Sequence, residues 1–540
     1  MSRTSRSLGA SFRRTTPIRS TIGEEHVEDR IGKARPLNSA SSNDRTAGDE
    51  PAAVADIGRS LPLVEELSPA PDVVTCVQAL AGEAGLLVLE SVLPRDGVGR
   101  YSFVTADPFE FFTVRAAQYK LDPLGPLQRW LRERPMDTVP GLPPFQGGAA
   151  GMLAYELGGC WERLPQSRYD EFRLPVLAVG LYDWTLGWDH AADRCWVVSQ
   201  GFPEQSEERR RARAARRLAW LRERLKTAAT ASSKSPPANV ASFQGGPTHV
   251  DAMAFSRQQL APHWPVPGWR DVFSDFTRDG YLRMVERVME YIRAGDIFQA
   301  NVSQRLVTPW RRSPLELYQR LRQSNPAPFA GYFACDDWAV VSASPERLLR
   351  VRGGEVETRP IKGTRPRGHG PEADLFTRDE LRESEKDVAE NVMIVDLLRN
   401  DLSRVCRPGS IRVPTLCAVE TYQTVQHLVS QVRGRLRDDA DAWSLFEAVF
   451  PGGSVTGAPK IRAMQVIAEQ EPTVRGPYCG SLFYVGFDGS VDSNILIRTF
   501  VCRHGWAQCS VGGGVVAQSD PAAEYEETLH KAEGMLRALR

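Results

Sequence analysis

One lysine, Lys362, stands in a segment whose residue types suit covalent chemistry. It follows Arg-Pro-Ile (359–361) and precedes Gly-Thr-Arg (363–365), so a proline and a glycine fix the backbone around a single amine. An amine that is withdrawn from water and placed near other cations has a lowered pKa, and its neutral form is a nucleophile. Most lysines are instead solvated charges beside a turn. The segment alone therefore leaves two interpretations, a nucleophile and an inert surface lysine.

Carboxylates recur at helical spacing in a segment that we expect to form a helix from about 378 to 405. Glu383, Asp387 and Glu390 occupy positions i, i+4 and i+7, beside a stripe rich in Val, Ile and Leu. Periodicity alone favours a solvated acidic face. The run Arg-Asn-Asp (399–401) is unusual for a plain surface helix, because it places a guanidinium and an amide next to a strongly apolar stretch.

A second helix with carboxylates is expected near residue 520. Asp520 and Pro521 form a start signal, an N-cap acid followed by a proline in the first turn. Glu527 and Lys531 follow at i and i+4, a spacing that by itself indicates a surface ion pair. Three glycines precede the helix (512–514) and would let backbone N–H groups approach an anion, although they match neither of the common phosphate-binding motifs.

Alternating strands and helices must hold these residues. Apolar runs at 84–91 and 101–104 suit buried strands, and helices are expected at 124–133 and 205–225, a pattern that favours sheets covered by helices. Shifts of composition divide the chain into a disordered arginine-rich tail (1–65), an N-terminal region (70–225), a linker rich in Ala, Ser, Thr and Pro (226–268) and a C-terminal domain (270–540).

The composition is that of an ordinary globular enzyme. The 540 residues are 42% hydrophobic and 25% charged, and Lys+Arg and Asp+Glu both number 67, so no global charge attracts nucleic acid or a membrane. The nine cysteines form no CxxC pair, and no apolar run is long enough to span a bilayer. We expect a cytoplasmic protein, although the arginine-rich residues 1–23 leave organelle targeting open.

Together the motifs resemble the chorismate-utilising enzymes, a family that includes component I of anthranilate synthase and of aminodeoxychorismate synthase as well as isochorismate and salicylate synthases. The resemblance is strong over 275–540 and looser over 70–190. It implies an α/β (α+β) chain with the anthranilate-synthase-like fold, mostly antiparallel sheets packed face to face with helices outside. The blocks that carry it are Ser-Ala-Ser-Pro-Glu-Arg (342–347), Pro-Ile-Lys-Gly-Thr (360–364), Ala-Glu-Asn (389–391), Gly-Ser-Val-Thr-Gly-Ala-Pro-Lys (453–460) and Glu-Tyr-Glu-Glu-Thr (524–528).

The resemblance assigns expected roles to individual residues. Glu390 and Glu527 match two glutamates that hold Mg²⁺, a cation that takes few protein carboxylates and completes its shell with water and substrate oxygens. Glu346 matches a general acid that protonates a departing hydroxyl, and His427 matches a histidine beside the substrate ring. The positions expected to contact the substrate dianion are Arg498, Lys531, Tyr478, Ser454 and Gln299, with the backbone amides of Gly512, Gly513 and Gly514.

Two positions indicate which reaction of the family is expected. Isochorismate and salicylate synthases carry a water-activating lysine where this chain has Gln299, so ammonia is the expected nucleophile. Anthranilate synthases typically carry alanine where this chain has Lys362, and aminodeoxychorismate synthases carry lysine. The resemblance therefore implies attack of Lys362 on C2 of chorismate, then displacement by ammonia at C4 to give 4-amino-4-deoxychorismate, a precursor of 4-aminobenzoate and folate.

Regulation and partners follow from the same resemblance. Glu90 and Ser91 match one half of a tryptophan pocket, whereas the other half departs from the family pattern in the run Asn-Pro-Ala-Pro-Phe-Ala (325–330). No Gly-x-Cys-x-Gly elbow is present, so a separate glutamine amidotransferase subunit is expected to supply ammonia. Two alternatives remain, an anthranilate synthase component I and a catalytically silent partner protein that binds chorismate or tryptophan.

Overall fold

Apolar runs separated by short turns form antiparallel strands in the structure, a computed structural model that describes residues 62–93, 98–134, 136–232, 254–367, 370–421 and 425–540. The tail, residues 1–65, is expected to be disordered. Its residues 1–61 lie outside the described part of the chain. The first strand begins at Leu63, just before the boundary expected at 65. Every element described below belongs to the unit Gly58–Arg540.

The larger sheet has 13 strands and combines residues from both ends of the chain. Neighbouring strands in this sheet pair antiparallel, including β2 with β12, which joins the N-terminal region to the C-terminal one. In sheet order the strands are β1 (Leu63–Leu67), β8 (Arg194–Ser199), β7 (Trp184–Asp189), β3 (Tyr101–Thr105), β2 (Leu87–Glu90), β12 (Phe329–Cys335), β13 (Trp338–Ser344), β22 (Thr499–Arg503), β23 (Trp506–Val515), β11 (Gln299–Pro309), β10 (Phe273–Ser274) and β9 (Trp264–Pro265), with β19 (Gly457–Ala458) beside β11.

The second sheet has 10 strands and is antiparallel as well. Here β5 of the N-terminal region pairs with β20 of the C-terminal region. In sheet order the strands are β16 (Ile361–Pro366), β18 (Val425–Arg435), β15 (Glu355–Arg359), β14 (Arg347–Arg352), β21 (Val491–Asn494), β20 (Ser481–Gly486), β5 (Gly148–Leu153), β6 (Leu177–Tyr182) and β4 (Glu110–Val114), with β17 (Arg412–Thr421) beside β18.

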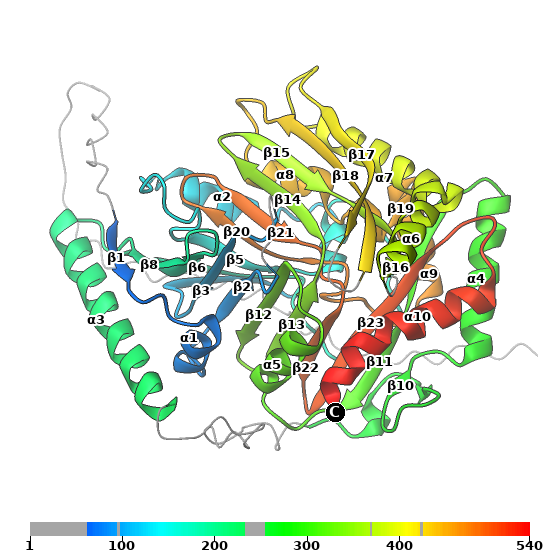
Figure 1. The fold of residues 1–540 in the computed structure, drawn as a ribbon, viewed down its shortest axis with the longest axis horizontal. Helices are drawn as coiled ribbons and strands as arrows, with labels where there is room; N and C mark the ends of the chain where they lie inside the picture. The colour runs from blue at the N-terminus through cyan, green and yellow to red at the C-terminus, as the bar shows by residue number, and fades with distance from the viewer. Residues whose placement is uncertain (1–61, 94–97, 135, 233–253, 368–369, 422–424) are drawn as a thin grey trace, which may run out of the picture. The chain divides into compact units, whose positions relative to one another are not determined.

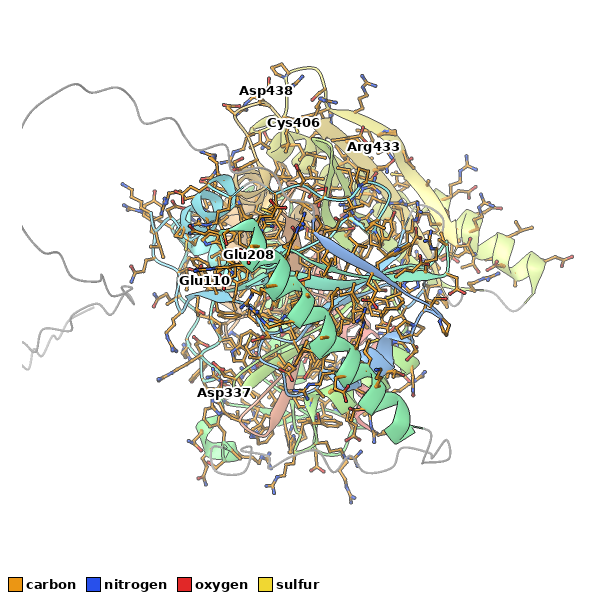
Figure 2. The ribbon with its side chains drawn as sticks, turned by 90° about the vertical axis from the view of Figure 1, so that its left-hand side faces the viewer. Glu110, Glu208, Asp337, Cys406, Arg433 and Asp438 are labelled. Carbon is orange, nitrogen blue, oxygen red and sulfur yellow. The ribbon has the colours of Figure 1, made fainter. Side chains whose placement is uncertain are left out.

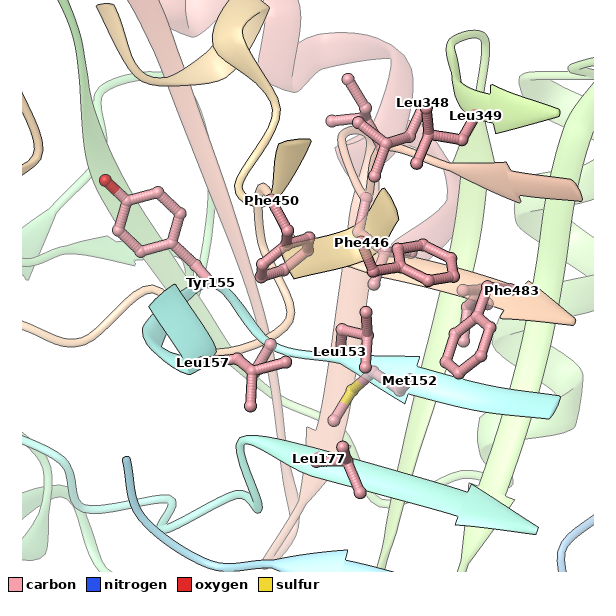
Figure 3. Packing of buried hydrophobic residues seen from close by; sticks show 14 of the residues in the cluster. Met152, Leu153, Tyr155, Leu157, Leu177, Leu348, Leu349, Phe446, Phe450 and Phe483 are labelled. Atoms are coloured by element: carbon pink, nitrogen blue, oxygen red, sulfur yellow. The ribbon is translucent and has the colours of Figure 1, made fainter. Parts of the chain in front are cut away.

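The main hydrophobic core lies between the two sheets. It combines Phe103 and Phe333 of the larger sheet with Met152, Leu177 and Phe483 of the second sheet. Figure 3 shows part of this packing: Met152 and Leu153 of β5 lie between Leu177 of β6 and Phe446 of the helix Ala442–Val449. The ring of Phe446 also packs against that of Phe483 of β20. Each of these side chains is at least 95% buried, and burial of a large apolar side chain contributes roughly 1.5–3 kcal/mol. This core confirms the expected antiparallel sheets packed face to face.

Helices cover the outer faces of the sheets and enclose two smaller cores. One core lies on the outer face of the larger sheet, and Figure 2 looks onto this side, where α3 runs across the front with Glu208 in its first turn. The other core joins α4, α9 and α10 to β11 and β23 (Figure 1). The helices are α1 (Val73–Ala79), α2 (Gly125–Arg132), α3 (Glu207–Ser232), α4 (Arg278–Arg293), α5 (Pro314–Ser324), α6 (Pro371–Glu383), α7 (Glu385–Ser403), α8 (Ala442–Val449), α9 (Lys460–Gln470) and α10 (Pro521–Leu536).

The single helix expected from about 378 to 405 is wrong, because the structure divides this segment into α6 and α7. The break falls at Ser384, whose side chain accepts a hydrogen bond from the backbone N–H of Asp387 at 3.3 Å and so caps α7. Glu385 and Asp387 in the first turn favour a helix start at this point. α7 therefore begins at Glu385 as a separate helix and carries Glu390 in its second turn.

The sequence regions do not correspond to separate sheets. Residues 70–225 and 270–540 contribute strands to both sheets, as the β2–β12 and β5–β20 pairs show. Of the expected linker, residues 226–232 continue α3, residues 257–259 form a 3₁₀ turn, and 233–253 lie outside the described residues. Among the described helices, none is long and apolar enough to cross a membrane.

Candidate active site

A cavity of about 760 Å³ opens between β16, β18 and β23, with α7 and α10 along its rim. Most residues predicted from the sequence line this one space, although they come from segments far apart in the chain. They are Glu346, Lys362, Glu390, His427, Ser454, Tyr478, Arg498, Gly512, Gly514, Glu527 and Lys531. Gln299 and Gly513 are not among the lining residues, although Gly513 faces Glu527 and Lys531. Glu90 and Ser91 lie in another pocket.

Lys362 and Glu346 meet at one wall of the cavity through Ser454. The Lys362 Nζ donates a hydrogen bond to the backbone oxygen of Ser454 at 2.9 Å, and the Ser454 Oγ donates to the Glu346 Oε1 at 2.7 Å. A register shift between β16 and β18 follows Lys362, where Gly363 has a φ of +68°. A Cβ on Gly363 would lie 2.9 Å from the carboxyl carbon of Asp387, so only glycine fits beside α7 at this bulge.

Both groups are shifted toward their neutral forms. Burial raises the pKa of Glu346 to about 7, despite the opposing hydrogen bond from Ser454 and the charge of Lys362. Burial also lowers the pKa of Lys362, and the charges of Glu390 and Glu346 only partly oppose this shift. Near neutral pH the cavity can therefore hold a protonated carboxyl and an amine with increased neutral character, which are the forms that a general acid and a nucleophile require.

His427 faces the cavity from β18, directly across from β16. Its Nδ1 lies 2.9 Å from the hydroxyl oxygen of Thr364, the residue with which it pairs in the sheet. The imidazole is 98% buried, so this hydroxyl orients a ring that has little contact with solvent.

Two carboxylates reach the cavity from different helices, Glu390 from α7 and Glu527 from α10. Burial raises the pKa of Glu390, with Lys362 and Lys386 opposing it. For Glu527, burial is outweighed by the charge and hydrogen bond of Lys531, which lower its pKa. In the described part of the chain, no three His, Cys, Asp or Glu side chains gather as a metal site. A pair of glutamates nevertheless fits Mg²⁺, which commonly takes one or two protein carboxylates and several water or substrate oxygens.

Cationic groups line the same cavity. Within the described residues, the Arg498 guanidinium has no hydrogen bond or ion pair, and burial lowers its pKa. Arg498 also has a φ of +52°, an uncommon conformation for a residue with a side chain and one found often at functional sites. Lys531 donates to the backbone oxygen of Gly512 at 2.9 Å and pairs with Glu527 at 2.6 Å. This arrangement suits an anionic ligand.

The three glycines belong to β23 rather than to a loop before α10. Gly512 and Gly514 line the cavity, and all three pair with β11, so their amides alternate between the ladder and the free edge. A Cβ on Gly514 would lie 2.0 Å from the Nε2 of Gln299 and 3.5 Å from a carboxylate oxygen of Glu390. The Gln299 amide is therefore packed directly against Gly514, on the side of β23 where Glu390 lies. Only alternate glycine amides are available to a ligand.

Comparisons with known proteins agree with this geometry. The family model described as chorismate binding enzyme matches residues 105–537. The chain belongs to this family. Aminodeoxychorismate synthase component 1 of Salmonella typhimurium is 38% identical over 452 residues, covering 82% of this chain and 90% of that protein. Anthranilate synthase component 1 of Streptomyces coelicolor is 41% identical over 470 residues, covering 86% of each chain.

The fold of this chorismate binding enzyme is also found in solved structures. The crystal structure of anthranilate synthase component I from Streptococcus pneumoniae superimposes with a TM-score of 0.64 at 28% sequence identity, covering 81% of this chain and 92% of that one. The expected anthranilate-synthase-like fold is thereby confirmed.

Sequence reasoning missed several residues that line the cavity, and Lys386 and Thr364 are two of them. Lys386 precedes Glu390 by one helical turn and pairs with Glu524 at 3.5 Å, so its i, i+4 spacing could have placed it on the same face as Glu390. Thr364 follows Lys362 by two residues, and the period of a strand could have placed it on the same side.

Glu90 and Ser91 line a second pocket, of about 410 Å³, apart from the cavity described above. The Glu90 carboxylate accepts hydrogen bonds from the Tyr318 hydroxyl at 2.5 Å and from the Arg322 Nε at 2.9 Å. The Ser91 Oγ donates to the backbone oxygens of Tyr101 and Pro328 at 2.9 and 3.1 Å. Both side chains are thus engaged within the protein, and tryptophan binding in this pocket stays a prediction.

Proposed function

We propose that this chorismate binding enzyme aminates chorismate at C4 and releases 4-amino-4-deoxychorismate, the precursor of 4-aminobenzoate for folate synthesis. Lys362 carries this proposal. Its amine is held 2.9 Å from the Ser454 backbone oxygen, on the cavity wall that Glu346 shares, and burial lowers its pKa. Relatives named aminodeoxychorismate synthase component 1 and anthranilate synthase component 1 are similarly close, so the residues of the cavity must distinguish the two reactions.

The first step of the proposed reaction forms a bond between the Lys362 Nζ and C2 of the substrate ring. The two ring double bonds shift as the C4–O bond breaks, and Glu346 gives a proton to the departing hydroxyl, which leaves as water. A carboxyl whose pKa is about 7 is suited to this transfer near neutral pH. Ser454 contacts both groups, so acid and nucleophile stand in a fixed relation.

In the second step ammonia bonds to C4, the double bonds shift back, and the C2–N bond to Lys362 breaks. The amine of Lys362 is thereby regenerated, and the enolpyruvyl group stays on the ring. Gln299 has no basic group that could activate water, which favours ammonia as the incoming nucleophile. The net reaction consumes chorismate and ammonia and releases the amino product and water.

Substrate charge is balanced by residues from several elements. Arg498 and Lys531 would bind the carboxylates of the dianion, with Tyr478 beside them. Glu390 and Glu527 are the residues that would hold Mg²⁺, which supplies positive charge for the ring carboxylate of the substrate. We further propose that a separate glutamine amidotransferase subunit supplies the ammonia, since no nucleophile elbow for that chemistry occurs in the sequence.

The deciding experiment incubates the purified protein with chorismate, Mg²⁺ and an ammonium salt. The expected product gives 4-aminobenzoate only after a separate lyase is added. Anthranilate, by contrast, is fluorescent and would form directly. Fluorescent product without lyase would refute the proposal in favour of an anthranilate synthase, and absence of any turnover would favour a binding protein without activity.

The matching variant is Lys362→Ala. Its amination at C4 should fall to background, because among the described residues no other amine is held against Ser454 and Glu346. Lys226→Ala, an exposed lysine on α3, is the control and should keep wild-type turnover. Mass spectrometry of wild-type enzyme quenched during turnover without ammonia should detect the substrate ring, less water, attached to Lys362. Full C4 amination by Lys362→Ala would contradict covalent catalysis.

A further inference from the structure

Arg475 is a buried cation just outside the cavity, and neither the sequence motifs nor the proposed reaction gives it a role. It lies between α9 and β20, three residues before Tyr478, and is 95% buried. Burial disfavours its charge, but the neighbouring carboxylate of Glu471 outweighs this and holds the pKa of Arg475 well above its usual value. A permanent charge at this depth needs a function that a smaller or apolar side chain could not perform.

The guanidinium of Arg475 holds the backbone of two segments that line the cavity. Its Nη1 donates to the backbone oxygen of Val455 at 3.0 Å, and its Nη2 donates to the backbone oxygen of Asn301. Val455 and Asn301 both line the cavity, whereas Arg475 does not. The backbone N–H of Asn301 in turn donates to the oxygen of Thr456 at 2.7 Å, which ties the same two segments together.

Arg475 is itself fixed from two directions. Glu471, four residues earlier and just after α9, accepts its Nε at 2.9 Å and its Nη2 at 2.7 Å. Its guanidinium also lies 4.6 Å from the ring centre of Tyr155 and 5.6 Å from that of Tyr478. The planar group therefore has one orientation, and its remaining donors have defined targets.

The held segment, the turn Gly453–Val455, carries Ser454, the residue that contacts both reacting groups. We propose that Arg475 is a positioning residue, which fixes this turn so that the backbone oxygen of Ser454 receives Lys362 while its hydroxyl receives Glu346. This inference rests on the proposed function for the roles of Lys362 and Glu346. A displacement of about 1 Å in such an arrangement can lower a rate by roughly a hundredfold.

Arginine is required here by geometry rather than by charge alone. Five N–H donors in one plane serve Glu471, Val455 and Asn301 at the same time. A lysine keeps the charge that neutralises Glu471, but its single ammonium cannot span two backbone oxygens and a bidentate carboxylate. Arg475→Lys therefore separates positioning from charge.

The test compares Arg475→Lys with Arg503→Lys. Arg503 on β22 also joins a carboxylate, Asp337, to two backbone oxygens, those of Phe172 and Arg173, but neither of these two residues lines the cavity. For Arg475→Lys we expect kcat for chorismate consumption to fall roughly ten- to a hundredfold while KM changes less than kcat. Arg503→Lys should keep the wild-type kcat at a temperature where both variants are folded.

The pH profile supplies a readout that a loss of stability would not move. The groups that face Glu346 are the Ser454 hydroxyl, the backbone N–H of Ile361, the amine of Lys362 and, more weakly, the thiol of Cys479. Because the Ser454 hydrogen bond lowers the pKa of Glu346, displacement of Ser454 should move the alkaline limb of kcat/KM to higher pH. In the double variant Arg475→Lys with Ser454→Ala, the shift should be no larger than in Ser454→Ala alone.

The outcomes separate this inference from the proposed function, because chorismate consumption is followed whatever product forms. Anthranilate as the wild-type product would refute the function and leave the comparison of the two arginines valid. A folded Arg475→Lys with wild-type kcat and pH profile would overturn the positioning role. So would equal losses in Arg475→Lys and Arg503→Lys. If Arg475→Lys does not fold, Glu471→Gln takes its place, since it loosens the same guanidinium and should shift the pH profile in the same direction.

Discussion

The acid of this site owes its proposed role to its surroundings. Glu346 is 96% buried and keeps a single close side-chain partner, the hydroxyl of Ser454, which stabilises its ionised form less than water would. Its pKa of about 7 is therefore a consequence of packing. Exposed glutamates such as Glu526, one residue before Glu527, meet no comparable environment.

The pH dependence of turnover follows from this carboxyl. Glu346 must be protonated to act as an acid, so kcat/KM should decline as pH rises through about 7. Glu346→Gln should lower kcat by roughly 10²- to 10⁴-fold and remove the alkaline limb. The measurement is the initial rate of chorismate consumption between pH 5 and 9.

Asp275→Asn is the control for Glu346→Gln. Asp275 is another buried carboxyl, whose pKa burial raises to about 6, but it accepts from Thr473 and from the backbone of Arg305 and does not line the cavity. Its replacement should leave the alkaline limb unchanged. If the limb persisted in Glu346→Gln, another group would have to be the acid.

Whether Glu527 binds Mg²⁺ can be tested by replacing it and its neighbour Glu526, both on α10, one at a time. Glu527→Ala should raise the Mg²⁺ concentration for half-maximal turnover by at least roughly tenfold, because a direct carboxylate ligand would be lost. Glu526→Ala removes an exposed carboxylate that does not line the cavity and should leave the Mg²⁺ titration unchanged. Identical Mg²⁺ curves for wild type and Glu527→Ala would exclude Glu527 as a ligand.

At the scale of elements, strand β23 has two glycines, Gly512 and Gly514, that are packed too closely to accept a side chain, each for a different reason. The Cβ of an alanine at 512 would meet the backbone oxygen of Val302 at 2.3 Å, a neighbour that cannot move without opening the β11–β23 ladder. The Cβ of an alanine at 514 would meet the side-chain nitrogen of Gln299 at 2.0 Å. The first contact is with the backbone of the neighbouring strand, and the second is with a side chain next to Glu390.

The two alanine variants should therefore fail in different ways. Gly512→Ala should lower the free energy of unfolding by about 1–3 kcal/mol, since the backbone of β11 has to shift. Gly514→Ala should displace Gln299 and lower kcat/KM by roughly ten- to a hundredfold with a smaller loss of stability. Urea denaturation and steady-state kinetics on the same preparations compare the two. Equal effects of both on stability and on turnover would show that Gln299 is not the group that Gly514 accommodates.

Elements also explain which parts of the site were predictable. Motif residues such as Glu390 and Lys362 carry their signal in adjacent positions, so the sequence was sufficient to place them among candidates. Arg475 carries no such signal, because its partners Val455 and Asn301 are distant in the sequence and are contacted through backbone atoms, which have no residue identity. The break at Ser384 had a local signal, an N-cap serine before acids, which the helical spacing of Glu383, Asp387 and Glu390 across the break obscured.

At the scale of the whole described unit, the antiparallel sheets were expected and are confirmed, whereas their composition was not foreseeable. Local periodicity identifies strands such as β2 and β3, but pairing depends on partners that are hundreds of residues away, as for β5 and β20. The buried ion pair between Arg305 of β11 and Glu171, 2.6 Å apart, is a further link between the N-terminal and C-terminal regions. The catalytic cavity thus depends on a core that both regions build.

This arrangement predicts that residues 62–232 and 254–540 unfold together. In a urea series followed by hydrogen exchange and mass spectrometry, amides of β5 should lose protection at the same urea concentration as amides of β20, because each strand supplies hydrogen bonds to the other. The first turn of α3, an exposed helix end, is an internal reference and should exchange at lower urea. Earlier exchange of all the N-terminal strands would mean that the C-terminal region retains its core alone, which the shared packing of Met152 and Phe483 opposes.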